Sequence, residues 1–226
     1  MAISLEELIR RSVNRIGDVH PWIKESAIEI ITRAYQEGIY VQFSSGYRSN
    51  EDQAWIYGQG RPSYVWNGKK YGTAGAIVSN AKPGTSVHNY RLALDYFLVS
   101  EDGKQSLWTV NDKWRRVAAI AKSFGYEWGG DWKSFVDYPH IQFTRGLSIA
   151  QLAAGSLPTF PQIVKKEVAG VSEQKLNASQ EKLLNEAKRL KLTDGREPFG
   201  EVNRMYLFSV IVGLAQQVEE LKKKVK

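Results

Sequence analysis

The sequence contains no cysteine among its 226 residues. This absence excludes disulfide bonds, thiolate zinc fingers, iron–sulfur clusters and cysteine nucleophiles. Any bound metal must therefore be held by histidine, aspartate or glutamate. Histidine is itself scarce, with 3 residues in the whole chain. The search for a metal site therefore starts from His20, His88 and His140.

Long hydrophobic runs are absent as well. No stretch approaches the roughly 18 apolar residues that span a bilayer, and residues 1–13 lack the apolar region of a signal peptide. We therefore expect a chain without a transmembrane segment, synthesised in the cytoplasm and released, if at all, by other means. The formal net charge of +7 favours anionic partners such as cell wall polymers. No basic stripe or stacking platform indicates specific nucleic-acid binding.

The composition changes along the chain. All 7 tryptophans and all 3 histidines precede residue 141, and the remainder is rich in Lys, Glu, Gln and Leu. With Pro158 and Pro161, this change predicts a first domain over residues 1–147, a linker over 148–171 and a helical module over 172–226. The module has a short heptad seam, whose spacing favours pairing of two copies over packing on the first domain. The seam residues are Leu207, Ile211, Leu214, Val218, Leu221 and Val225.

Hydrophobic periodicity predicts the elements of the first domain. Helices are expected over residues 21–36, 50–58 and 111–124, and strands over 39–43, 92–99 and 140–143. Because the strands are unevenly spaced, we predict an α+β fold in which helices flank a small antiparallel sheet. His20, directly before Pro21, is interpreted as a helix-entry residue. The glycine-rich residues 58–86 are predicted to form a long functional loop.

Three side chains have the donor types of a catalytic zinc site. His88, Asp95 and His140 supply three nitrogen or oxygen donors, which leaves a fourth position for water. Asp95 interrupts an otherwise apolar strand, where an ionised carboxylate is costly unless it is paired or metal-bound. His88 precedes that strand and His140 begins another, so neighbouring strands would bring the three groups together.

Two further residues fit hydrolysis at such a centre. Asp137, three residues before His140, would take a proton from the attacking water and return it to a leaving amine. Arg48 would stabilise a tetrahedral oxyanion. Each residue also has an ordinary structural role open to it: a hydrogen-bonded histidine, an Asp95 paired with an arginine, or a turn at Asp137. Spacing alone leaves these alternatives open.

Four motifs resemble a known family. Together they are similar to the zinc peptidases of the D-alanyl-D-alanine carboxypeptidase and vancomycin-resistance dipeptidase group. Within that group they most resemble the L-alanyl-D-glutamate endopeptidases of bacteriophage endolysins, over about residues 1–145. The motifs are Gly46-Tyr47-Arg48-Ser49, Ser86-Val87-His88-Asn89-Tyr90, Trp128-Gly129-Gly130-Asp131-Trp132 and Asp137-Tyr138-Pro139-His140.

The resemblance implies roles for individual residues. It implies the zinc ligands His88, Asp95 and His140, with Asp137 as general base and acid and Arg48 polarising the scissile carbonyl. It also implies that Gln53 and Ser86 hold the substrate peptide. Trp128 is a candidate cleft wall, although aromatic residues at helical or strand spacing are more often part of the core. Arg91 stands where the family often has glycine, and the dipeptidase branch has glutamate at the position of Asp137.

The function implied is a zinc-dependent endopeptidase that cleaves the L-alanyl–D-glutamate bond in peptidoglycan stem peptides. An endolysin of this kind accumulates in the host cytoplasm and acts on the wall after release, causing host cell lysis. The helical module would then bind the wall or form oligomers. Two alternatives stay open: a D-alanyl-D-alanine carboxypeptidase or dipeptidase, and a non-catalytic wall-binding protein with a structural metal.

Overall fold

The computed structural model describes residues 2–164 and Asn185. The helical module predicted over 172–226, with its heptad seam, lies outside the described residues except for Asn185. The helices are α1 (Leu5–Ile16), α2 (Pro21–Gln36), α3 (Asn50–Gly58), α4 (Asp112–Ser123) and α5 (Ile149–Ala153), with 3-10 turns η1 (Val87–Tyr90) and η2 (Gly129–Asp131). None of these helices is long and apolar enough to cross a membrane.

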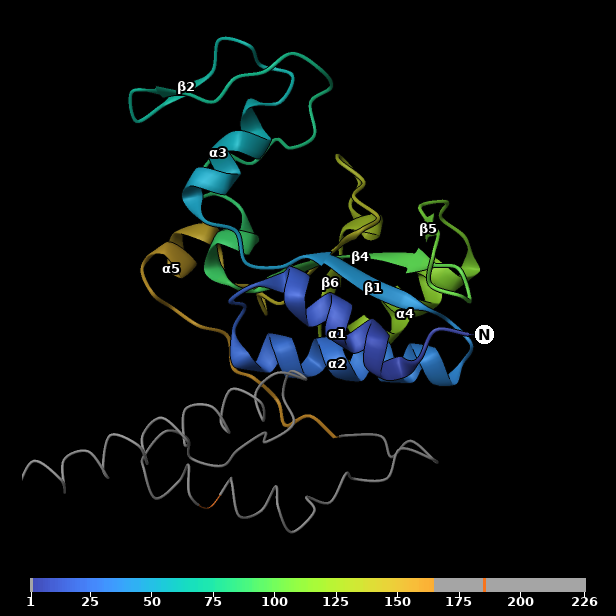
Figure 1. Ribbon diagram of the computed structural model, residues 1–226. Coiled ribbons are helices and arrows are strands. Elements are labelled where there is room, and N and C mark those ends of the chain that lie inside the picture. The colour runs from blue at the N-terminus through green and yellow to red at the C-terminus, as the bar shows by residue number, and fades with distance from the viewer. Residues whose placement is uncertain (1, 165–184, 186–226) are drawn as a thin grey trace, which may run out of the picture. The chain divides into compact units, whose positions relative to one another are not determined.

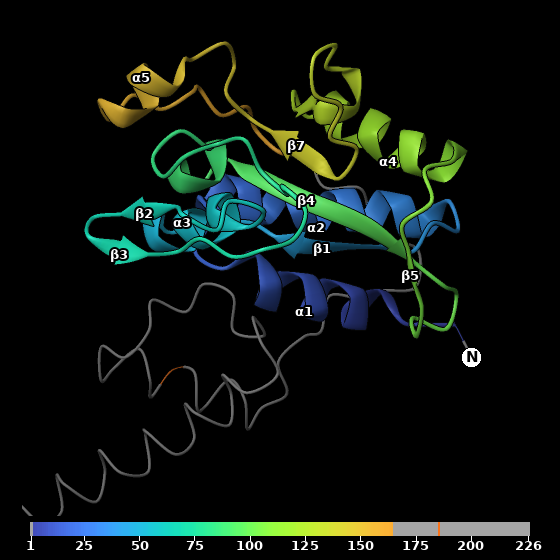
Figure 2. The same cartoon turned by 90° about the horizontal axis from the view of Figure 1, so that it is seen from above.

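The strands form an antiparallel sheet with a small separate hairpin. In the sheet the order is β1 (Val41–Ser45), β4 (Ala93–Val99), β7 (His140–Gln142) and β6 (Glu127–Trp128), and β5 (Ser106–Leu107) also pairs with β4. The hairpin consists of β2 (Val65–Trp66) and β3 (Lys69–Lys70). Helices α1 and α2 run along the sheet (Figures 1 and 2). The predicted α+β fold with an antiparallel sheet is confirmed.

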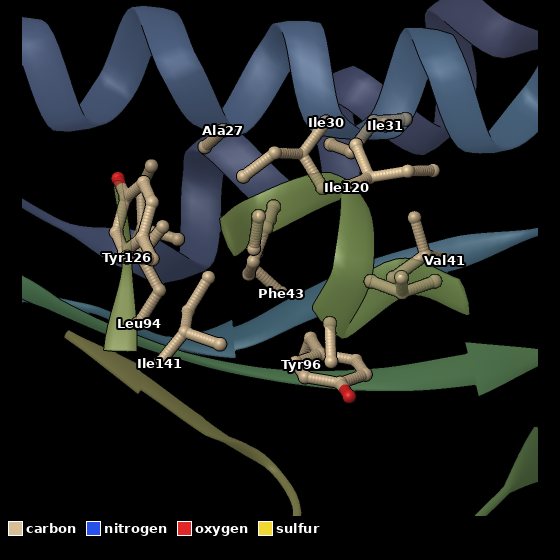
Figure 3. Close-up of a cluster of buried hydrophobic side chains, with 14 of the residues drawn as sticks. Ala27, Ile30, Ile31, Val41, Phe43, Leu94, Tyr96, Ile120, Tyr126 and Ile141 are labelled. Atoms are coloured by element: carbon tan, nitrogen blue, oxygen red, sulfur yellow. The ribbon is translucent and has the colours of Figure 1, made fainter. Parts of the chain in front are cut away.

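The hydrophobic core lies between the helices and one face of the sheet. Figure 3 shows Ile30 of α2 and Ile120 of α4 directed toward Phe43 of β1 and Leu94 of β4. All four side chains are almost completely buried. Successive side chains of a strand point to opposite faces, so Leu94 and Tyr96 face the core while Asp95 faces away from it. The core therefore fixes the strand that carries the central carboxylate.

Most predicted elements begin within a residue of their expected position, but β1 begins two residues late. The backbone N–H of Ile39 still donates to Ala34 O of α2, at 2.9 Å. That hydrogen bond completes the end of the helix, so the chain turns before it can pair with β4. The interpretation of His20 as a helix-entry residue is confirmed, because His20 caps α2 and its Nδ1 accepts from Trp22 N at 3.2 Å.

Part of the predicted linker contacts the first domain. Ser148 caps α5, and the chain then crosses α2. Trp22 Nε1 donates to Pro161 O at 2.6 Å, and the Phe160 ring stacks on His20 with centroids 4.1 Å apart. Residues 148–164 therefore form a packed strap, and the position of the domain boundary beyond it stays a prediction.

Candidate metal centre and active site

The sheet register brings two of the predicted ligands side by side. Asp95 of β4 pairs directly with His140 of β7. On the other side of β4, Asp95 pairs with Ser45, after a register shift in β1 that follows Phe43. The chain leaves β1 at this irregularity and continues into the segment that carries Gly46 and Arg48. One strand position thus gathers groups from three separate parts of the sequence.

His88 reaches the same point from η1. Its ring is buried, and His88 Nδ1 lies 2.6 Å from Gly46 O. The backbone N–H of Arg48 donates to His88 O at 3.2 Å. Gly46 is required here because a Cβ atom at this position would overlap the backbone of Ile16. The Gly46-Tyr47-Arg48 segment and η1 therefore hold each other in place.

Three donor atoms form a nearly equilateral triangle. His88 Nε2 lies 3.2 Å from His140 Nδ1, His140 Nδ1 lies 3.2 Å from Asp95 Oδ1, and His88 Nε2 lies 3.3 Å from the same oxygen. Ligands at bond lengths near 2.0–2.2 Å in a tetrahedral site are separated by about 3.3–3.5 Å. The observed edges match this separation, so the donor set fits zinc with one position left open.

The second nitrogen of each imidazole has an acceptor that fixes its proton. His88 Nδ1 donates to Gly46 O, and His140 Nε2 donates to Gln142 Oε1 at 3.1 Å. Because these nitrogens carry the protons, His88 Nε2 and His140 Nδ1 each direct a lone pair toward the centre of the triangle. Gln142 is held in turn by its donation to Glu127 Oε2 at 2.9 Å. Sequence reasoning missed Gln142; the available signal was its position two residues from His140, on the same strand face.

The electrostatics of the triangle keep its carboxylate ionised. Burial raises the pKa of Asp95, but the charges of His88 and His140 and their hydrogen bonds hold that pKa well below its usual range. Burial lowers the pKa of His140, but its hydrogen bond to Asp95 and the charge of that carboxylate raise the pKa above its usual value. Without a metal ion, the centre thus attracts a proton.

Arg48 lies beside the triangle and contacts the second oxygen of Asp95. Arg48 Nη2 is 3.4 Å from Asp95 Oδ2 and donates to Ser45 Oγ at 3.3 Å. Burial lowers the pKa of Arg48, while the carboxylates of Asp95, Asp137 and Asp52 raise it. The pairing of Asp95 with an arginine, which the sequence left open, is therefore realised together with the two histidines.

Asp137 lies near the charged groups of the triangle and near Arg48. Its backbone N–H donates to Gly129 O at 3.0 Å, and its carbonyl accepts from His140 N at 3.3 Å. Burial raises the pKa of Asp137, the charge of Asp95 raises it further, and His140, His88 and Arg48 oppose the shift. A half-buried carboxyl with a raised pKa is suited to accept a proton and return it.

The three predicted substrate-binding side chains lie below the surface. Gln53 is 0% exposed, accepts from Arg48 Nη1 at 2.9 Å and donates to Ala81 O at 2.7 Å. Trp128 is buried, and its Nε1 donates to Tyr138 O at 2.8 Å. Ser86 is buried at the start of η1. The structure brings Gln53 to Arg48 but does not place any of the three on an open surface.

Arg91 occupies a backbone position that favours glycine. It ends η1 with φ 66° and ψ 20°, in the left-handed region. Its side chain pairs with Asp18, and its carbonyl accepts from His20 N at 3.0 Å. The departure from the family pattern therefore concerns the turn after η1, and these contacts hold the arginine in the strained conformation.

The sequence is similar to one described family and to two named peptidases. A family model described as D-alanyl-D-alanine carboxypeptidase matches residues 79–143. The peptidoglycan L-alanyl-D-glutamate endopeptidase CwlK of Bacillus subtilis (strain 168) is 41% identical in an alignment of 134 residues that covers 56% of this chain and 74% of that protein. The L-alanyl-D-glutamate peptidase of Listeria phage A118 is 42% identical in an alignment of 73 residues that covers 29% of this chain and 25% of that protein.

Two solved structures are similar at lower identity. The L-Ala D-Glu endopeptidase ChiX of Serratia marcescens is 23% identical with a TM-score of 0.39, over 59% of this chain and 86% of that one. The L,D-carboxypeptidase DacB of Streptococcus pneumonia is 21% identical with the same TM-score of 0.39, over 64% of this chain and 77% of that one.

Proposed function

Because the chain belongs to the D-alanyl-D-alanine carboxypeptidase group of zinc metallopeptidases, together with the endopeptidase CwlK, we propose that it hydrolyses the L-alanyl–D-glutamate bond of peptidoglycan stem peptides. The observation that carries the proposal is the triangle of His88 Nε2, Asp95 Oδ1 and His140 Nδ1, with edges of 3.2–3.3 Å. It lies in a chain whose 41%-identical relative is named for this cleavage.

His88, Asp95 and His140 would hold the zinc ion. Zinc bound in this way supplies a water of lowered pKa and polarises the substrate carbonyl. Asp95 is anchored for this task at both oxygens, because Oδ1 faces the histidines and Oδ2 faces Arg48. The chemistry then depends on how the neighbouring side chains handle a proton and a developing negative charge.

Asp137 and Arg48 would carry those two tasks. Asp137 takes the proton of the attacking water on its carboxylate and gives it to the departing amine, which leaves atoms and charge balanced. Arg48 donates hydrogen bonds to the carbonyl oxygen as negative charge develops there. Gln53 and Asp95 hold the guanidinium in position. Gln53 therefore acts through Arg48, and Ser86 and Trp128 support η1 and the Asp137 turn from below.

Mass spectrometry of digested cell wall tests this function. The zinc-loaded full chain should release fragments with a new amino-terminal D-glutamate and leave L-alanine on the muramic acid. The Asp137→Asn variant should bind one zinc ion per chain and lose cleavage by about 10²–10⁴-fold. Loss of terminal D-alanine with the L-alanyl–D-glutamate bond intact would replace the proposal by a carboxypeptidase. Full lytic activity in Asp137→Asn would overturn the mechanism.

We also propose that the chain acts as a modular, bacteriolytic endolysin. The similarity to a phage peptidase supports action on a host cell wall after synthesis in the host cytoplasm. The seam at Leu207, Ile211 and Leu214 supports a homo-oligomer, and the charge of +7 supports contact with anionic wall polymers. Sedimentation of the full chain and of a variant with asparagine at these three positions tests the oligomer; equal masses corresponding to one copy would contradict it.

A further inference from the structure

A hollow lies beside α3, and none of the metal ligands lines it. Its volume is about 430 Å³, and its walls are Trp55 of α3, Gln59 at the end of that helix, and the loop residues Thr73, Ala74, Gly75, Ala76 and Val78. Figures 1 and 2 show α3 and the β2–β3 hairpin next to one another at one end of the sheet. All of its lining residues except Trp55 belong to the glycine-rich segment 58–86, and the metal centre does not explain the function of residues 73–78.

Trp55 presents an indole ring to solvent in a fixed orientation. The side chain is 44% exposed, although exposing so large an aromatic surface to water is unfavourable. The Tyr71 ring packs edge-on against it, with centroids 4.9 Å apart. Lys69 Nζ lies 5.6 Å from the ring centroid and is itself paired with Glu51. These contacts hold the ring and leave part of its surface uncovered.

Three polar groups around this ring have no hydrogen-bond partner among the residues that the structure describes. Among residues 2–164, no hydrogen bond is made by the indole N–H of Trp55, the carboxamide of Gln59 or the hydroxyl of Thr73. Gln59 follows the last residue of α3, and it lines the same hollow as Trp55. The hollow thus combines an apolar ring with an amide and a hydroxyl that are available to a ligand.

The loop that completes the hollow is held in its conformation. Thr73 N donates to Gly58 O at 3.1 Å, and Arg61 Nη1 donates to Ser79 O at 3.0 Å. Gly58 allows close contact with the backbone at Tyr71, where a Cβ atom would overlap the carbonyl. Because the walls are already fixed, a ligand would not have to order the loop in order to bind.

The chemistry of the walls indicates a neutral, polyhydroxylated ligand. None of the lining residues is charged, and Lys69 nearby is neutralised by Glu51. An anion or a cation would therefore find no counter-charge in the hollow. A pyranose ring has an apolar C–H face that stacks on an aromatic ring, and its hydroxyl and acetamido groups hydrogen-bond to amides and hydroxyls.

We propose that this hollow, defined by Trp55, Gln59 and Thr73, binds an N-acetylated sugar of the peptidoglycan glycan strand. The choice of occupant rests on the proposed function, because the stem peptide is attached to that strand. Gln53, which holds Arg48, lies on the same helix. With a rise of about 1.5 Å per residue, Trp55 lies about 3 Å farther along its axis, and Gln59 follows at the end of the helix. The enzyme therefore holds the peptide at the metal centre and the sugar chain beside α3.

A binding experiment tests the site without relying on cleavage. The Asp137→Asn full chain is titrated with the tetramer of N-acetylglucosamine by isothermal calorimetry. We expect binding that weakens at least tenfold when Trp55→Ala is added. Trp108→Ala is the matched control, because Trp108 is also exposed, at 55%, but lies before α4 and stacks on Phe97. No measurable binding, or equal weakening by the two substitutions, overturns the sugar site.

A kinetic comparison separates the sugar site from the proposed function. The substrates are the free stem peptide and the same peptide carried on a tetrasaccharide. We expect kcat/KM at least tenfold higher for the tetrasaccharide-linked peptide, a ratio near one in Trp55→Ala, and an unchanged ratio in Trp108→Ala. A ratio near one in the unmodified chain, or a ratio retained in Trp55→Ala, contradicts the sugar site. If neither substrate is cut at the L-alanyl–D-glutamate bond, the proposed function fails, while the titration still decides whether the hollow binds sugar.

Discussion

Gln53 is a buried side chain that we expect to affect catalysis through its hydrogen bond with Arg48. Its carboxamide accepts from Arg48 Nη1 and donates to Ala81 O, so it fixes the guanidinium relative to the 58–86 loop. Replacement by methionine keeps the volume but removes both hydrogen bonds. We expect kcat to fall about 10- to 100-fold, because small misplacements of a catalytic group cost rates of this order.

The measurement is steady-state cleavage of a soluble stem peptide, with zinc content determined on the same samples. Gln105→Met, at an exposed position, is the control and should behave as the unmodified chain. An unaltered kcat in Gln53→Met would mean that Arg48 does not depend on this contact. A loss of zinc would indicate that Gln53 acts through the metal ligands instead.

Gln142 acts on the other side of the centre. Its Oε1 receives the Nε2 proton of His140 and so directs the Nδ1 lone pair toward the metal. We expect Gln142→Leu to weaken zinc binding by about 10- to 100-fold, the usual effect of removing such a hydrogen bond. Competition with a chromophoric chelator measures the affinity. Gln105→Leu is the control, and unchanged affinity in Gln142→Leu would show that the hydrogen bond does not orient the ligand.

At the residue scale, the sequence identified the donors but not what supports them. His88, Asp95 and His140 could be found because a carboxylate inside an apolar strand and two histidines at strand starts are costly or rare. Gln142 was not identified, since glutamine is common on strands and only its tertiary contacts reveal its role. Gln53 was identified through the family resemblance as a residue that holds the substrate peptide, whereas the contact that the structure shows is with Arg48. Burial of Trp128 and Ser86 likewise depends on how η1 and the Asp137 turn pack.

At the scale of elements, the strap over residues 148–164 stabilises the first domain. Phe160 stacks on His20 and Phe143, and Trp22 Nε1 donates to Pro161 O. We expect Phe160→Ala to lower the free energy of unfolding by about 2 kcal/mol, less than the 3–5 kcal/mol of a fully buried phenylalanine. Urea denaturation measures the change. Leu157→Ala, at a position 59% exposed, should cost little; equal effects of the two substitutions would argue against the strap.

Helices were predicted more accurately than short strands, for a physical reason. The helix over residues 50–58 was predicted from its serine cap, and the structure has it as Asn50–Gly58 with Ser49 capping it. β2, β3, β5 and β6 have two residues each, which is too short for an alternating pattern. Even where the partner is near in the sequence, as in the β2–β3 hairpin, two residues show no alternation that a local pattern could reveal.

At the scale of the whole molecule, the metal centre joins residues that are far apart in the sequence. The ligands come from η1, β4 and β7, and the unfolded chain does not hold them together. Zinc therefore binds mainly the folded state and stabilises it, by about 2.7 kcal/mol at a free concentration 100 times Kd. For a domain of this size we expect Tm to rise by about 5–10 °C when zinc is added to the metal-free protein.

This increment in Tm should grow with pH. The pKa of His140 is raised by Asp95 in the metal-free centre, and the proton occupies the nitrogen that zinc needs. That proton stabilises the metal-free fold below the ordinary histidine pKa of about 6.5, and the stabilisation is lost as pH rises through the raised pKa. Both effects make the zinc increment larger at pH 8 than at pH 6. Scanning calorimetry with and without zinc measures it, with His20→Asn as the control that keeps the increment and His88→Ala as the variant that loses it. An increment that is equal at the two pH values, or that persists in His88→Ala, would mean that zinc stabilises the chain at some other place.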